Sequence, residues 1–308
     1  MPNFLDLDPV GPDALRTIID AAKARKAARA GLPKGMADDD ATLDGHVLAS
    51  VFEKTSTRTR VSFEIAMRQL GGTALTLSAG SMQIGIGETI DDTARVLSRY
   101  VDIIQLRTDR HDKLTALAEA ASVPVINGLT DDTHPCQLVA DVMTVEERLN
   151  RPVSETTWAW LGDGNNVCQS MIEACGLLGF TLRLSTPAAY DPDDRFVATA
   201  EARGAKIEVV RNPHEAVRGA DVIVTDTWVS MGDRDRNKRI IALSPYQVNE
   251  ALMAEAADEA VFIHCLPAHR GEEVTDAVID GTQSAVFDQA ENRVHAQKAI
   301  LLWCLGKL

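Results

Sequence analysis

The sequence predicts an α/β fold with two doubly wound parallel-sheet domains and an active site in the cleft between them. Short apolar segments alternate with helix-length amphipathic segments along most of the 308 residues, and the joins between them are short. The alternation stops at the linker-like residues 151–156 and then starts again. Repeated strand–helix units form parallel sheets, whose ligands bind at the carboxyl ends of the strands.

The first half of the chain has the more regular alternation. Residues 13–30 predict a surface helix rich in alanine, arginine and lysine, which Gly31 and Pro33 end. The strand-and-helix pairs that follow are strand 46–52 with helix 57–70, strand 73–77 with helix 89–99, strand 101–106 with helix 111–121, and strand 123–126 with helix 135–149. We therefore place the first domain at residues 1–150.

The second domain is expected at residues 151–290. Its predicted elements are strand 157–161, helix 167–178, strand 181–185, helix 193–203, strands 206–210 and 221–225, a charged loop at 230–239, helix 245–257 and strand 261–264. The last element is an amphipathic helix from about Asn292 to Leu305. Since this helix is long enough to return across the domain boundary, we expect residues 291–308 to pack on the first domain.

Composition narrows the class of protein. Apolar residues make up 45% and charged residues 25%, which is typical of a globular chain. The net charge of −14 argues against nucleic acid or a membrane as the principal partner, and no apolar run approaches the roughly 18 residues of a transmembrane helix. Five cysteines form no CxxC pair and no zinc spacing, and no signal peptide is recognisable. This pattern predicts free thiols and a cytoplasmic location.

The segment Phe52–Arg60 carries the clearest chemical signal. It falls where a strand turns into a helix and contains three hydroxyls and two arginines. A helix N-terminus is partly positive, so Arg58 and Arg60 are unfavourable there unless an anion lies among them. Free backbone N–H groups, hydroxyls and a guanidinium together make a phosphate site. A Ser or Thr helix cap with two solvated arginines is the alternative.

Further polar residues stand at other strand ends of the first domain. Arg107 ends an apolar strand, and His134 precedes Pro135, which suits the first position of a helix. We expect Arg107 and His134 near the anion site, although a strand-end arginine is often solvated and a lone histidine often structural. Glycines at 80, 85 and 87 indicate either a flexible connection or a ligand-facing loop before a helix capped by Thr89.

The second half offers two patterns that invite other interpretations. Gly162 and Gly164 resemble the start of a dinucleotide-binding GxGxxG, but Val167 replaces the third glycine and no acidic residue ends the next strand. An NAD-dependent oxidoreductase is therefore excluded. His264 and His269 are potential metal ligands, but we expect no carboxylate at helical spacing to complete a site with them. We predict neither a metal nor a cofactor.

Taken together, these segments resemble the aspartate/ornithine carbamoyltransferase family over nearly the whole chain. The matching segments are Ser56–Arg60, Leu106–Thr108, His134–Gln137, Asp226–Gly232 and His264–Pro267. The first is shared by aspartate and ornithine enzymes, whereas Ser230–Gly232 and Cys265–Pro267 point to the ornithine enzymes. The resemblance implies a carbamoyl-phosphate domain, an amino-acid domain and a homotrimer with sites at subunit interfaces.

The resemblance also implies roles for individual residues. The residues that would bind carbamoyl phosphate are Ser56, Thr57, Arg58, Thr59, Gln83, Arg107, His134, Gln137, Cys265, Leu266 and Arg293. Gln83 would reach the site of a neighbouring subunit. The residues that would hold L-ornithine are Asn166, Asp226, Ser230 and Met231. The catalytic set would be Arg58, Arg107, His134 and Cys265. Three positions depart from the expected pattern, namely Thr55, Ile86 and Gln105.

The implied reaction agrees with these residue types. The δ-amine of L-ornithine attacks the carbonyl carbon of carbamoyl phosphate, and L-citrulline and phosphate result, a step of arginine metabolism. Thr59, Arg107 and His134 would donate hydrogen bonds to the carbonyl oxygen. Asp226, Cys265 and the leaving phosphate are alternatives as acceptors of the amine proton. Two other functions stay open, which are transfer to aspartate, putrescine or acetylornithine, and anion binding by a non-catalytic paralogue.

Overall fold

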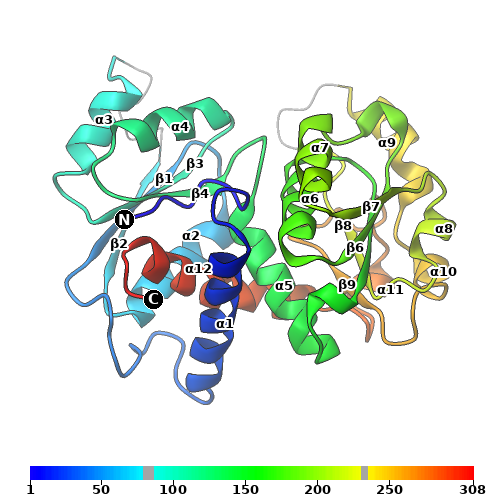
Figure 1. Ribbon diagram of the computed structural model, residues 1–308, viewed down its shortest axis with the longest axis horizontal. Helices are drawn as coiled ribbons and strands as arrows, with labels where there is room; N and C mark the ends of the chain where they lie inside the picture. Colours follow the sequence, from blue (N-terminus) through cyan, green and yellow to red (C-terminus); the bar gives the residue numbers. More distant parts are fainter. Residues whose placement is uncertain (79–86, 230–234) are drawn as a thin grey trace. The chain divides into compact units, whose positions relative to one another are not determined.

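The computed structural model describes residues 1–78, 87–229 and 235–308, which form two compact units. Unit 1 comprises Met1–Ala140 and Glu291–Leu308, and unit 2 comprises Asp141–Ala290. Each unit contains one parallel β-sheet with helices on both of its faces (Figure 1). The predicted class, two doubly wound α/β domains, is therefore confirmed, while the location of an active site between them stays a prediction.

The sheet of unit 1 has the strand order β2-β1-β3-β4. Its strands are β1 (Val47–Phe52), β2 (Thr73–Ser78), β3 (Ile103–Arg107) and β4 (Val125–Leu129). The chain runs from β1 outward to β2 and then returns to place β3 on the other side of β1. The topological switch point, where ligands bind in doubly wound sheets, therefore lies between the carboxyl ends of β1 and β3. Phe52 is paired with Arg107 at this edge.

Helices cover both faces of this sheet. They are α1 (Pro12–Ala28), α2 (Thr57–Gln69), α3 (Ile90–Leu97), α4 (His111–Ala120), the first part of α5 (Pro135–Leu149) and most of α12 (Val286–Cys304). Strand residues such as Val51 and Leu106 pack with Leu114 and Leu117 of α4 in one buried apolar cluster. Each fully buried side chain of this size contributes about 1.5–3 kcal/mol. On the other face α12 contacts α1 and α2.

Gln105, which departs from the expected apolar pattern, is completely buried in β3. It accepts a hydrogen bond from Ser50 of the neighbouring strand β1. Its amide occupies the space above Gly128, where an added Cβ would lie 1.9 Å from Nε2. A glycine at 128 thus makes room for the polar pair, and the departure is accommodated inside the sheet.

The sheet of unit 2 has the strand order β7-β6-β5-β8-β9. Its strands are β5 (Thr157–Leu161), β6 (Thr181–Ser185), β7 (Lys206–Val209), β8 (Val222–Thr225) and β9 (Val261–Ile263). The helices are α6 (Asn166–Leu178), α7 (Asp194–Ala202), α8 (Pro213–Val217), α9 (Arg236–Leu243), α10 (Glu250–Met253) and α11 (Asp276–Ile279). The switch point lies between β5 and β8.

Two predicted elements of the second half are wrong, and a third begins at a different residue. The charged loop at 230–239 ends in helix α9, which begins at Arg236. The helix predicted at 245–257 is instead a 3₁₀ turn at Ser244–Tyr246 followed by the short α10. Val248 lies between them and bonds to Glu273 and Thr275, so tertiary backbone pairing overrides helix propensity. Helix α12 begins at Val286, earlier than the predicted Asn292.

Candidate active site

The predicted anion segment lies at the start of α2, immediately after β1. Ser56 is the N-cap, and its Oγ accepts the backbone N–H of Thr59 at 3.2 Å. The first turn of α2 contains no acidic residue. Thr57 is exposed and Arg58 is half-buried, so a hydroxyl and a guanidinium lie in the first turn at a helix N-terminus. Ser56 can therefore cap α2 while Thr57 and Arg58 of the same segment bind an anion.

Thr59 is the centre of a cationic cluster in unit 1. Its buried Oγ1 accepts hydrogen bonds from Arg107 Nη1 at 3.3 Å and from Arg293 Nη2 at 2.7 Å. The other terminal nitrogen of Arg293 donates to Gln137 Oε1 at 2.9 Å. Four of the predicted phosphate and carbamoyl contacts thus converge from β3, α2, α5 and α12. Two guanidinium groups on one hydroxyl favour an anionic ligand.

His134 lies beside this cluster, one residue before α5, and is almost completely buried. Burial, together with the charges of Arg293, Arg107 and Arg58, holds the pKa of His134 well below its ordinary value. The imidazole is therefore neutral at physiological pH. A neutral imidazole has one N–H to donate and does not carry a charge that would need a counter-ion in this buried position.

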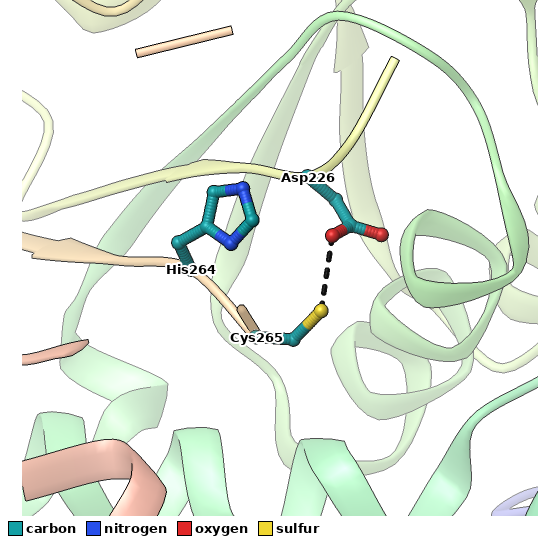
Figure 2. Close-up of side chains that lie close together, drawn as sticks. All are labelled: Asp226, His264 and Cys265. Carbon is teal, nitrogen blue, oxygen red and sulfur yellow. Dashed lines mark hydrogen bonds between the residues drawn. The ribbon is translucent and has the colours of Figure 1, made fainter. Parts of the chain in front are cut away.

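In unit 2, the candidate residues follow the carboxyl ends of three neighbouring strands, β5, β8 and β9. Asp226 follows β8, and one of its carboxylate oxygens accepts a hydrogen bond from Asn165 Nδ2 at 2.8 Å. The other oxygen accepts the thiol of Cys265 at 2.9 Å, as Figure 2 shows. Asn165 also caps α6 by accepting the N–H groups of Val167 and Cys168. Asp226 is thereby held between the cap of α6 and Cys265, which stands two residues after the end of β9.

Asn165 was missed by the sequence reasoning, which selected Asn166 as the ornithine contact. Asn166 is the first residue of α6 and is half-buried. An asparagine immediately before an apolar helix is an N-cap signal, and this signal was available at Asn165. The contact between Asn165 and Asp226, by contrast, joins residues 61 positions apart, so no local pattern predicts it.

Two glycines that resembled a dinucleotide fingerprint serve packing instead. An added Cβ at Gly162, where φ is +114°, would lie 2.8 Å from Nε1 of Trp228. At Gly164 it would lie 2.2 Å from the backbone nitrogen of Pro192. The segment between β5 and α6 is thus closely covered, which explains glycine at both positions without a nucleotide.

The turn after β9 is held by a buried polar chain. His264 Nδ1 accepts the backbone N–H of Leu266 at 2.8 Å, and His264 Nε2 faces Glu273 Oε1 at 3.4 Å. Both side chains are completely buried. Leu266 has φ of 58°, in the left-handed region that a leucine rarely adopts, and the Leu266–Pro267 peptide is cis. The histidine therefore stabilises a strained backbone next to Cys265.

Asp226, His264 and Cys265 also form a group of three potential metal ligands, whose ligand atoms lie within 4.8 Å of one another (Figure 2). The carboxylate of this group comes from the end of β8. The expectation that no carboxylate stands at helical spacing from the histidines was wrong, because Glu272 and Glu273 follow His269 by three and four residues and form a second such group with it. Within the described residues, His264 Nδ1 is bonded to Leu266 and the Cys265 thiol to Asp226. The expectation that no metal takes part stays a prediction.

Three predicted site residues, namely Gln83, Ser230 and Met231, lie outside the described residues, as does Ile86. Among the residues that are described, no helix is sufficiently long and apolar to span a membrane.

Comparison with known proteins identifies both halves of the chain. The carbamoyl-P binding domain of aspartate/ornithine carbamoyltransferase matches residues 2–147, and the Asp/Orn binding domain of the same family matches residues 154–304. A protein of Rhizorhabdus wittichii named ornithine carbamoyltransferase is 61% identical over 306 residues, which are 99% of each chain. The ornithine carbamoyltransferase of Caulobacter vibrioides is 54% identical over 99% of this chain and 98% of its own length.

Solved structures agree with the sequence matches. The ornithine carbamoyltransferase from Pyrococcus furiosus has a TM-score of 0.93 at 45% identity and covers 100% of this chain and 98% of its own. The enzyme of the same name from Thermus thermophilus has a TM-score of 0.88 at 40% identity and covers 98% of each chain. The resemblance seen in the motifs is confirmed, and the chain belongs to the aspartate/ornithine carbamoyltransferase family.

Proposed function

We propose that this protein transfers the carbamoyl group of carbamoyl phosphate to the δ-amine of L-ornithine, giving L-citrulline and phosphate. The proposal is supported by family membership of both halves and by full-length relatives named ornithine carbamoyltransferase. The structural observation that carries it is the convergence of Arg107 and Arg293 on Thr59 at the N-terminus of α2. This arrangement suits a phosphate joined to a polar acyl group.

Unit 1 supplies the groups that bind the donor. Ser56, Thr57 and Arg58 hold the phosphate at the start of α2, and Arg58 stabilises the charge that grows on it as it leaves. Thr59, Arg107 and neutral His134 donate hydrogen bonds to the carbonyl oxygen, on which charge develops when the amine attacks. Gln137 and Arg293 complete the donor site. Because these donors are fixed before the reaction, little reorganisation opposes the transition state.

Unit 2 supplies the groups that bind the acceptor. The Asp226 carboxylate attracts the cationic amino acid, with Asn166, Ser230 and Met231 as further contacts. The amine has to lose a proton before or during its attack. The Cys265 sulfur lies 2.9 Å from an Asp226 oxygen, so the two side chains orient one another. Asp226, Cys265 and the leaving phosphate are the candidate acceptors, and Leu266 lies beside the reacting centre.

We further propose a homotrimer in the cytoplasm, with Gln83 contributing to a neighbouring subunit's site. The trimer and the role of Gln83 follow from the family resemblance, and the cytoplasmic location follows from the cysteine pattern. The exposed apolar side chains of Val61, Leu75 and Tyr100 in unit 1 offer surface for contacts between subunits. Sedimentation equilibrium of the purified chain tests the trimer, and a monomer at micromolar concentration would contradict it.

The function is tested by product formation with a panel of amines. The purified protein is incubated with carbamoyl phosphate and, separately, with L-ornithine, L-aspartate, putrescine or acetylornithine, and the carbamoylated product and phosphate are both measured. We expect citrulline and phosphate in equal amounts with L-ornithine and no more than background with the others. Product from another amine and none from L-ornithine would overturn the substrate assignment, and no product from any amine would support a non-catalytic paralogue.

A further inference from the structure

Glu53 is an acidic residue next to the anion site, and the proposed reaction gives it no role. It follows the last residue of β1 and stands three positions before the N-cap Ser56. Its side chain is 17% exposed, so it does not extend freely into solvent. A carboxylate in this place opposes the binding of a phosphate. We therefore expect neighbouring groups that hold this carboxylate and offset its charge.

Two contacts of Glu53 lead to the end of β3. Its backbone N–H donates to the carbonyl oxygen of Arg107 at 2.9 Å. Its carboxylate accepts the hydroxyl of Thr108, which is completely buried. Arg107 in turn donates to Thr59 on α2. Two contacts thus join the segments that leave β1 and β3 at the switch point, one through Glu53 and one through Thr59.

Lys113, in the first turn of α4, matches the charge of Glu53. Its ammonium donates to Glu53 Oε2 at 2.9 Å and to Asp109 Oδ1 at 3.1 Å. Partial burial acts to lower the pKa of Lys113, but these two hydrogen bonds outweigh it and raise the pKa above its ordinary value. Lys113 is therefore charged at physiological pH and forms an ion pair with Glu53, beside the anion site.

We propose that Glu53 is a positioning residue that holds Arg107 against Thr59, and that Lys113 neutralises Glu53 so that its carboxylate does not repel the phosphate. This inference rests on the proposed function, because that function assigns Arg107 and Thr59 to the donor site. The positioning statement is that the hydrogen bonds of Glu53 position the arginine. The charge statement is that the charge of Lys113 protects the affinity for the anion.

The charge statement is tested with Lys113→Met, Glu53→Gln and the double variant that carries both changes. Calorimetric titration with inorganic phosphate measures affinity without turnover. We expect Lys113→Met to weaken phosphate binding about tenfold, since it leaves Glu53 unmatched. Glu53→Gln removes the repelling charge, so the double variant should bind phosphate nearly as well as Glu53→Gln alone. Equal, additive losses in the double variant would overturn the charge statement.

The positioning statement is tested with Glu53→Ala and Glu53→Gln. Glutamine still accepts the Thr108 hydrogen bond, whereas alanine does not. We expect Glu53→Ala to lower kcat about tenfold or more and Glu53→Gln to restore most of it. Asp112→Asn, which breaks an exposed ion pair in the same turn of α4, is the control and should leave both kinetic constants unchanged.

Each outcome identifies the statement that fails. Wild-type kcat in Glu53→Ala would overturn the positioning role, and an Asp112→Asn variant as impaired as Lys113→Met would assign the effects to a loosened α4. If Glu53→Ala does not fold, the comparison between Glu53→Gln and the double variant still decides the charge statement. A wild-type protein that forms no citrulline refutes the proposed function instead, while its phosphate affinities continue to test Lys113.

Discussion

Arg293 donates a hydrogen bond to Thr59 at 2.7 Å although 234 residues separate them in the chain. The same guanidinium donates to Gln137, which lies in the first turn of α5. Thr59 is in the first turn of α2, so one side chain from the last helix joins the starts of two others. All three side chains are nearly inaccessible to solvent. Arg293 therefore fixes the geometry of the proposed donor site as well as its charge.

The first prediction concerns this bridge. In Arg293→Lys the charge remains, but a single ammonium does not reproduce the planar fork that contacts both partners. Losing one buried charged hydrogen bond costs roughly 1.5–3 kcal/mol. We therefore expect kcat/KM for carbamoyl phosphate to fall about 10- to 100-fold. Arg110→Lys, at an exposed arginine of the same unit, is the control. Equal kinetics in the two variants would show that the Arg293 bridge has no role in the site.

The second prediction separates the two arginines at the start of α2. Arg58 is half-buried and its charge acts on His134, whereas Arg60 is exposed. We expect Arg58→Ala to abolish citrulline formation with an unchanged circular dichroism spectrum, and Arg60→Ala to retain most activity. A folded Arg58→Ala protein with near-wild-type turnover is incompatible with the phosphate role of this segment.

The third prediction concerns Asn165, whose side chain both caps α6 and bonds to Asp226. Aspartate is as good an N-cap as asparagine, so Asn165→Asp preserves the helix start. It places a second carboxylate against Asp226, which changes the charge state of the pair. We expect the KM for ornithine to rise at least about tenfold with little change in thermal stability. Asn249→Asp, at the cap of α10, is the matched control.

The fourth prediction is a pH dependence of stability. Burial and the charges of Lys298 and Lys26 lower the pKa of His295 to about 4. The pKa in the unfolded chain is about 6.5, so between these values the unfolded chain binds more protons. Stability is therefore full above about pH 6.5 and declines as pH falls toward 4, by roughly 3 kcal/mol from this group.

Urea unfolding at intervals between pH 7 and 4.5 measures this decline. His134, whose pKa is also lowered, contributes in the same direction, so His295→Gln should reduce the slope without abolishing it. Identical slopes in wild type and His295→Gln would show that His295 titrates normally in the folded protein.

The sequence predicted the fold through features that act locally. The strand–helix alternation, Pro135 at the start of α5 and Thr89 as the cap of α3 all appear in the structure. The failures occurred where distant residues decide the local conformation. Residues 245–257 have helical propensity, yet Val248 is drawn into backbone pairing with Glu273 and Thr275.

The candidate site shows the same division. Ser56 as a cap and Arg107 at a strand end are readable from neighbouring residues. The contacts of Arg293 with Thr59 and of Asp226 with Cys265 join segments far apart in the chain, so no local pattern predicts them. Only the family resemblance indicated that these residues belong to the site. The chain Glu273–His264–Leu266 was not predicted at all, because its members are unremarkable until the turn after β9 brings them together.

The central claim is that unit 1 binds the donor and unit 2 binds the acceptor, and the Asp226→Ala variant tests it most directly. Steady-state citrulline formation gives the KM for each substrate with the other at saturation. We predict a rise of about a hundredfold or more in the KM for ornithine and less than about threefold in the KM for carbamoyl phosphate, because Asp226 contacts Asn165 and Cys265 in unit 2. Equal increases in the two KM values would contradict the division of the site.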